Sequence, residues 1–361
     1  MPLFDEGYQG TRHDAKQFPL RVQRFGCFLR ELSGGDGRAS DTTLVFDKGN
    51  NSEANFTWLD TLALHFVGSV KLDEHKDLAT VVNTDARFVP CTAADLEGTK
   101  ACRVKRSVYG QERLLVVTYN QHLFDSQWLT LQTDLAKALE KLAGLSQQLA
   151  DRVNGVLTRG KAPTLASIEK QGETILSRPY LKRLIPTTVT AGTDGIPRLL
   201  SAVDAKVLAQ LAETYLGKTI LITNRENWTD EQIIQAYRSQ FLIEEVFKEM
   251  KDRHTGSWWP LYHWTDSKLQ VHGLYCTIAL LLRALLQRRL RQGGVHLSLK
   301  RTLAELDAIR AVVNVYPPKR HQQTHRRQIV LTKTSPLQQQ LMDILHLTSD
   351  QSDFRVTPPA I

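Results

Sequence analysis

One segment combines an acid, a cation and a phenol at a regular spacing. Tyr237, Glu244 and Lys251 lie seven residues apart. Because an α-helix has about 3.6 residues per turn, this spacing predicts that all three project from one helix face. Phe247 and Met250 lie beside them, and a carboxylate among core-facing apolar residues is costly unless an opposite charge compensates it. A bound metal ion or a neighbouring lysine would supply that charge.

A second candidate acid follows a predicted strand near the N-terminus. Thr42–Phe46 is β-branched and apolar, which predicts a buried strand, and Asp47 comes directly after it. Ser52 can cap a helix that runs to about Leu64, and His65–Val70 predicts the next strand. Strand, helix and strand in this order predict a parallel crossover unit.

The segment with Glu244 belongs to another strand and helix. Lys218–Thr223 predicts the strand, and Thr229 with Gln232 three residues later predicts a helix start through a capping box. Apolar spacing predicts further helices over Arg12–Arg30, Ser126–Val153, Lys268–Arg291 and Leu337–Leu345.

These elements predict four parts in the chain. Residues 1–72 form the first part of an α/β core, and residues 73–216 a mixed β/α insertion. Residues 217–292 form the second part of the core with the acid-bearing helix, and residues 293–361 a helical and basic tail. The insertion is inferred because short β-like pieces, one long helical stretch and Gly- and Pro-containing segments interrupt the regular strand–helix order.

Composition favours a soluble protein with an anionic partner. The 361 residues include 46 Lys and Arg against 38 Asp and Glu, a formal net charge of +8. Nucleic acid is the commonest such partner, although a basic protein without one remains open. The four scattered cysteines and the absence of a signal-peptide pattern indicate the reducing cytoplasm. The most apolar run, Leu274–Leu286, predicts a buried helix too short for a bilayer, which takes about 20 apolar residues.

The segment around Glu244 resembles the third-acid helix of bacterial insertion-sequence transposases of the DDE type, in the IS-four superfamily. That helix carries Tyr, two residues, Arg, three residues, Glu, six residues and Lys. Tyr237, Glu244 and Lys251 match, whereas Gln240 stands at the Arg position, with Arg238 nearby.

Two further segments extend the resemblance over most of the chain. Trp259–His272 is similar to the segment that follows this helix in one branch of the family. Asp47, Lys48 and Gly49 are similar to the family's second-acid motif of Asp, a basic residue and Gly.

The resemblance implies a ribonuclease-H-like α/β core, interrupted by a β-containing insertion before the final catalytic helix. Asp47 and Glu244 would be catalytic acids that help to hold two divalent ions, Mg²⁺ or Mn²⁺, about 4 Å apart. These ions promote in-line attack of water or a 3′-hydroxyl on DNA. The residues that would contact the DNA backbone are Tyr237, Arg238, Lys251 and Lys48. The implied partners are transposon ends, target DNA and a second copy in a synaptic homodimer.

The family's first acid has no counterpart at the expected place. Met1–Phe18 resembles the stretch that follows the first-acid strand, and neither Asp5 nor Asp14 ends an apolar strand. We therefore expect an N-terminally truncated transposase that binds two metals weakly and is inactive alone. A non-catalytic DNA-binding remnant and an unrelated nuclease of the same fold are the alternatives.

Three other patterns have simpler interpretations. His263, His272 and Cys276 suggest a zinc site, but a core or hydrogen-bonded role is favoured because no second close pair exists. The tryptophans between 258 and 264 suggest base stacking, and packing of the catalytic helix is favoured instead. The basic stretch Lys319–Arg327 contacts DNA phosphates or is a solvated linker.

Overall fold

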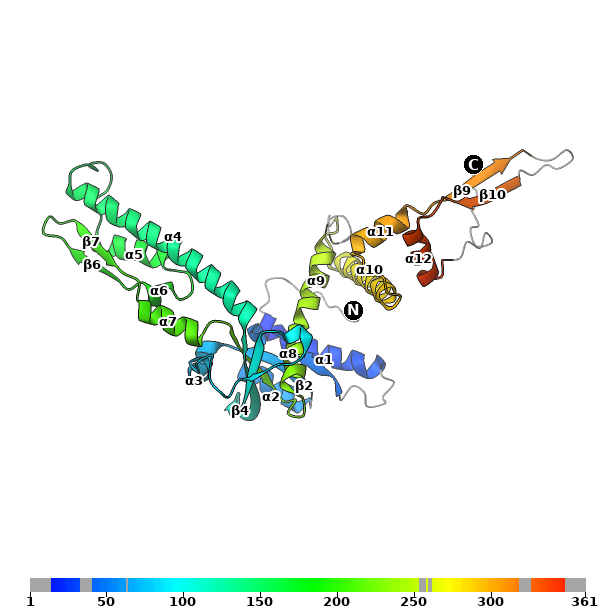
Figure 1. Ribbon diagram of the computed structural model, residues 1–361, viewed down its shortest axis with the longest axis horizontal. Helices are drawn as coiled ribbons and strands as arrows, with labels where there is room; N and C mark the ends of the chain where they lie inside the picture. The colour runs from blue at the N-terminus through cyan, green and yellow to red at the C-terminus, as the bar shows by residue number, and fades with distance from the viewer. Residues whose placement is uncertain are drawn as a thin grey trace. The chain divides into compact units, whose positions relative to one another are not determined.

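The computed structural model describes residues 14–32, 41–62, 64–252, 258, 262–317 and 326–347. These residues form two compact units, one within Thr11–Gln240 and the other within Phe241–Ile361. Both units mix helices and strands (Figure 1). The prediction of an α/β chain is confirmed at that level.

The first unit is built on a six-stranded mixed sheet with the strand order β1-β2-β8-β5-β4-β3. Its strands are β1 (Thr43–Val45), β2 (His65–Val70), β3 (Val89–Pro90), β4 (Thr99–Val108), β5 (Gln111–Asn120) and β8 (Lys218–Thr223). β1 and β2 are parallel, and the other neighbouring pairs are antiparallel. The strands predicted before Asp47, at His65–Val70 and at Lys218–Thr223 are confirmed.

The predicted parallel crossover is present. After β1 come a short 3-10 turn, η2 (Lys48–Asn50), and the helix α2 (Glu53–Thr61), and β2 then pairs in parallel with β1. Ser52 caps α2 as expected, because its hydroxyl accepts a hydrogen bond from the backbone N–H of Asn55 at 3.1 Å. Local capping and β-branched residues therefore account for the β1–α2–β2 crossover.

Apolar side chains fill both faces of the sheet. On one face, Phe46, Phe56 and Phe66 form an aromatic cluster that α1 (Asp14–Leu32) and α2 cover. On the other face, Ile233 and Ile234 of α8 (Asp230–Arg238) pack against the sheet. The central strand β5 serves both faces, since its side chains alternate: Leu115 and Val117 join the aromatic cluster, and Leu114 and Val116 join the α8 side.

The predicted insertion, residues 73–216, divides between two structures. Its first part supplies β3, β4 and β5 to the sheet, together with η3 (Leu72–His75), α3 (Lys76–Ala79) and η4 (Ala94–Leu96). Its second part forms a lobe of α4 (Gln121–Val153), α5 (Leu165–Ile175), α6 (Leu181–Leu184) and α7 (Ala205–Thr214), with the hairpin β6 (Thr187–Ala191) and β7 (Pro197–Ser201). This lobe has its own hydrophobic core and extends from the sheet (Figure 1). Only residues 121–216 are thus separate from the sheet.

The second unit contains α9 (Gln240–Lys251), α10 (Asp266–Gln292), α11 (Leu299–Asp307), β9 (Ala311–Tyr316), β10 (Arg326–Leu331) and α12 (Pro336–Leu345). Leu290, Val295 and Leu341 form its small core. The prediction of a helical tail was incomplete, because β9 and β10 form an antiparallel hairpin. The valines of β9 favour a strand, since β-branched side chains fit a pleated surface. The basic stretch Lys319–Arg327 lies outside the described residues except for its last two, which begin β10.

The helix α10 differs from its prediction in length and in burial. It has 27 residues, and large apolar side chains along it are exposed, among them Tyr275 at 68% and Leu282 at 61%. Its buried residues are Cys276, Leu280 and Leu290. The prediction of a buried helix was therefore wrong. Among the helices in the described ranges, α10 is the one that has the length and apolar composition to cross a membrane.

Candidate functional site

The helix that carries the three predicted site residues is interrupted at Ser239. α8 ends at Arg238 and α9 begins at Gln240, and the Ser239 hydroxyl donates a hydrogen bond to the carbonyl of Ala236 at 2.6 Å. Such side-chain to backbone bonds compete with the helical pattern and bend helices. Tyr237 lies in the first unit, whereas Glu244 and Lys251 lie in the second. The prediction that one continuous helix presents all three was wrong.

The start of α8 agrees with its prediction. The Thr229 hydroxyl accepts a hydrogen bond from the backbone N–H of Gln232 at 3.2 Å, and the Gln232 side chain accepts one from the N–H of Thr229 at 2.9 Å. Next to this capping box, the Glu231 carboxylate accepts hydrogen bonds from Thr92 Oγ1 at 3.0 Å and from the N–H of Ala93 at 3.2 Å. The backbone N–H groups of Thr92 and Ala93 lower the pKa of Glu231, so its charge is held at this helix start.

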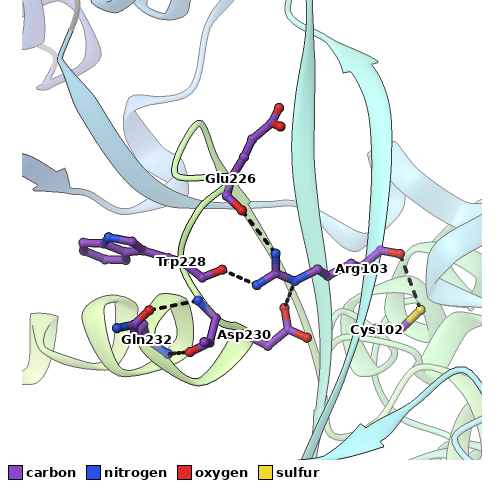
Figure 2. Close-up of polar contacts among 7 residues, drawn as sticks. Cys102, Arg103, Glu226, Trp228, Asp230 and Gln232 are labelled. Atoms are coloured by element: carbon purple, nitrogen blue, oxygen red, sulfur yellow. Dashed lines mark hydrogen bonds and ion pairs between the residues drawn. The ribbon is translucent and has the colours of Figure 1, made fainter.

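Arg103 of β4 anchors the loop between β8 and α8 (Figure 2). Its guanidinium donates hydrogen bonds to the Asp230 carboxylate at 2.5 Å, to the Glu226 carbonyl at 3.4 Å and to the Trp228 carbonyl. Lys105 on the same strand pairs with the Glu226 carboxylate at 2.6 Å. These contacts hold the first turn of α8 against β4, and the position of that turn sets where Tyr237 lies.

Tyr237 directs its hydroxyl toward the sheet. The hydroxyl donates a hydrogen bond to Ser69 Oγ on β2 at 2.9 Å. Burial raises the pKa of Tyr237, and the negative charge of the nearby Asp47 raises it further. Because Val45 lies opposite Val67 in the parallel β1–β2 pair, Asp47 follows β1 at the level of Ser69, the residue that Tyr237 contacts. Asp47 and Tyr237 are distant in the sequence but thus lie near the same point of β2.

Asp47 and Lys48 lie at the end of β1, as predicted, and both are exposed. Asp47 precedes the turn η2, and its side chain forms no capping hydrogen bond there. Within the described ranges, its carboxylate has no hydrogen bond or ion pair either. An exposed carboxylate of this kind can accept a ligand or a cation without first losing an internal partner.

Arg238 is held by contacts within the first unit. Its guanidinium donates hydrogen bonds to the carbonyl of Asp95 at 2.9 Å and to Thr99 Oγ1 at 3.0 Å. With Tyr237 it lines an open hollow of about 560 Å³, whose other polar residues include His122. Arg238 is partly exposed, and these two hydrogen bonds fix α8 to η4 and to the first residue of β4.

Glu244 and Lys251 share one surface of α9. Together with Phe247, Lys248 and Asp252 they line an open hollow of about 610 Å³. Their seven-residue spacing thus places them on one side of the helix, as predicted. The prediction that apolar core residues surround Glu244 was wrong, because α9 has no buried residue among those described and Phe247 is 53% exposed.

The described residues do not supply a complete metal centre. They include no group of three or more His, Cys, Asp or Glu side chains that is placed to hold a metal ion. A two-metal site needs several carboxylates around each ion. Asp47 and Glu244 each offer an exposed oxygen donor, but the donor set does not fit two divalent ions.

The residues after α9 that suggested a zinc site or base stacking agree only in part with the roles predicted for them. The rings of His263 and His272 lie 5.6 Å apart, and Trp258 lies 5.6 Å from His272. Cys276 is buried, in agreement with a core role. Trp264 is 89% exposed, so the predicted packing against the core was wrong for this residue, and Trp259 lies outside the described residues.

Sequence reasoning missed Ser69 and Arg103. Ser69 meets Tyr237 across 168 residues of chain, and Arg103 meets Asp230 across 127. A lone serine in a strand carries no local signal of such a contact. The basic residues that alternate along β4 indicate an exposed strand face, but they do not identify the acidic loop that the face contacts.

Comparisons with known proteins add no identification. The chain matches no protein-family model, no curated protein and no solved structure.

Proposed function

We propose that this chain is a transposase-derived DNA-binding protein of the DDE type that is catalytically incomplete by itself. The observation that supports this most is the position of Asp47, which follows β1 at the level of Ser69 on β2, the residue to which Tyr237 of α8 donates a hydrogen bond at 2.9 Å. The resemblance assigns Asp47 and Tyr237 to two separate motifs of one DNA-processing site. Their position near the same point of β2 is expected if the resemblance is correct.

The topology around Asp47 agrees with the ribonuclease-H-like core that we propose. A parallel β1–α2–β2 crossover places Asp47 just beyond the carboxyl end of a sheet strand. Binding and catalytic residues of open α/β sheets are commonly found outside these strand ends. Lys48, which is exposed beside Asp47, is a suitable contact for a DNA phosphate.

We propose no metal-dependent step for this chain alone. In an intact enzyme of the family, bound Mg²⁺ or Mn²⁺ would activate the attacking oxygen and stabilise the leaving oxygen. Here Asp47 and Glu244 supply two donors, and among the described residues neither belongs to a group of three or more His, Cys, Asp or Glu side chains that could hold a metal ion. We therefore favour the non-catalytic hypothesis over that of an unrelated active nuclease. In this hypothesis the chain occupies DNA ends or joins intact subunits in a dimer.

The test is a paired measurement of DNA binding and DNA cleavage by the full chain. We expect it to bind labelled duplex DNA without metal, with an affinity that falls steeply as salt rises. We expect no strand cleavage with Mg²⁺ or Mn²⁺. Failure to bind duplex DNA would overturn the proposed function. Cleavage that disappears in Asp47→Asn and Glu244→Gln would instead show a complete enzyme.

A further inference from the structure

The β9–β10 hairpin is a two-stranded ribbon that pairs with no other described strand. Its register places Ala311 opposite Leu331 and Tyr316 opposite Arg326. Every residue of β9 is exposed, and the ribbon projects beyond α11 and α12 (Figure 1). An isolated two-stranded ribbon is only marginally stable in water, so an exposed one is suited to a partner that covers it.

One face of this ribbon presents hydrogen-bonding side chains. Asn314 pairs with Gln328 in the register, and both are exposed. Opposed residues of an antiparallel pair lie on the same face. The hydroxyl of Tyr316 donates to Gln328 Oε1 at 2.9 Å, which places Tyr316 on that face too. The carboxamide groups of Asn314 and Gln328 are therefore neighbours on one accessible surface.

The charge of the ribbon has one sign. Residues 308–317 and 326–334 contain Arg310, Arg326, Arg327 and Lys333 and no Asp or Glu. Arg310 pairs with the exposed Asp307 of α11 at 3.5 Å. Because the ribbon itself has no acidic residue, its charge complements a polyanion rather than a second copy of the same ribbon.

We infer that the face of the β9–β10 ribbon that carries Asn314 and Gln328, with Val312 and Val330 beside them, binds duplex DNA in the major groove. That groove is about 12 Å wide and admits a two-stranded ribbon, and Asn and Gln side chains pair with the N6 and N7 edge of adenine. Arg326 and Arg327, the first two residues of β10, add two positive charges to the composition of the ribbon, which suits a partner that carries phosphates. This inference rests on the proposed function and deepens it, because it names a DNA-binding surface on the ribbon, to which the family resemblance assigns no residue. Residues 318–325 are not part of the proposed surface.

Fluorescence anisotropy of the full chain on two short duplexes, one A·T-rich and one of G·C pairs, tests the inference. Arg326→Ala/Arg327→Ala should weaken binding to both duplexes about tenfold and lower the salt slope by about 2. Asn314→Ala/Gln328→Ala should weaken binding to the A·T-rich duplex about tenfold and leave the G·C duplex unchanged. The control, Lys137→Ala/Lys141→Ala, removes two exposed charges from α4.

The outcomes separate this inference from the proposed function. Ribbon variants that bind both duplexes as the lysine control does would overturn the inference while leaving the proposed function intact. Ribbon variants that lose binding to phosphatidylserine vesicles but keep their DNA binding would also overturn the inference, in favour of a lipid surface as the partner. Circular dichroism of each variant shows whether a loss of binding is caused by unfolding.

Discussion

Arg113 and Asp60 form a bidentate ion pair that joins β5 to α2. Arg113 Nη1 and Nη2 donate to the two Asp60 carboxylate oxygens at 3.1 and 2.7 Å. The Arg113 side chain is 2% exposed, and its guanidinium lies 5.0 Å from the ring centroid of Phe56 and 5.3 Å from that of Phe66. The arginine therefore fixes the helix of the parallel crossover to a strand outside it.

Asp60→Asn should lower the free energy of unfolding by about 3 kcal/mol, because it leaves a buried guanidinium without its counter-charge. Urea denaturation monitored by circular dichroism measures this change. Glu173→Gln is the matched control, since its pair with Lys182 is 68% and 62% exposed and should contribute under about 0.5 kcal/mol. Equal losses in the two variants would contradict the structural role of the buried pair.

Tyr237→Phe should lower the free energy of unfolding by about 1 kcal/mol, since it removes the hydrogen bond to the buried Ser69. Tyr275→Phe is the control, because Tyr275 is 68% exposed. Urea denaturation again gives both values. If Tyr237→Phe left the free energy of unfolding unchanged, the Tyr237 hydroxyl would not be hydrogen-bonded to Ser69 in solution.

Elements with local signals were predictable from the sequence, and contacts between distant segments were not. Thr229 and Gln232 lie within one helical turn, so the capping box was visible before the structure. Asp47 was placed at a strand end by the β-branched residues before it. The break at Ser239 depends on one hydroxyl bonding one carbonyl, and spacing alone suggested an unbroken helix. The place of β4 and β5 in the main sheet depends on pairing with β8, which no local pattern encodes.

Lys218 should make stability rise with pH on the alkaline side. Its ammonium is buried and donates to the carbonyl of Ala79 at 2.9 Å, and burial lowers its pKa from 10.5 to about 8. Between pH 8 and 10.5 the unfolded chain holds a proton that the folded chain has lost, so unfolding becomes less favourable as pH rises. Below pH 8 both states are protonated and this effect is absent.

Comparison with Lys218→Met isolates that contribution. Tyr109, Tyr119 and Tyr180 have raised pKa values and act in the opposite direction above their unfolded values, but they are common to both proteins. The melting temperature of the wild type relative to the variant should therefore increase from pH 7.5 to pH 10. A constant difference would show that Lys218 titrates normally.

Arg103→Ala should loosen the loop before α8, because three hydrogen bonds from one guanidinium hold it (Figure 2). Amide hydrogen exchange of residues 224–232 should become faster, while exchange in α5 stays unchanged. Lys105→Ala removes a neighbouring charge of β4 that contacts the loop only through the exposed Glu226 side chain, so its effect should be smaller. Equal effects of the two variants would argue against the anchoring role of Arg103.

A buried and an exposed leucine of α10 should respond differently to truncation. Leu290 is 2% exposed and packs against Val295 and Leu341, so Leu290→Ala should cost about 2–5 kcal/mol of unfolding free energy. Leu282 is 61% exposed, and Leu282→Ala should change stability by less than about 0.5 kcal/mol. Both values come from denaturant titration of the full chain. If Leu282→Ala cost as much as Leu290→Ala, the surface of α10 around Leu282 would be covered in solution, and the buried helix predicted from the sequence would be the correct description.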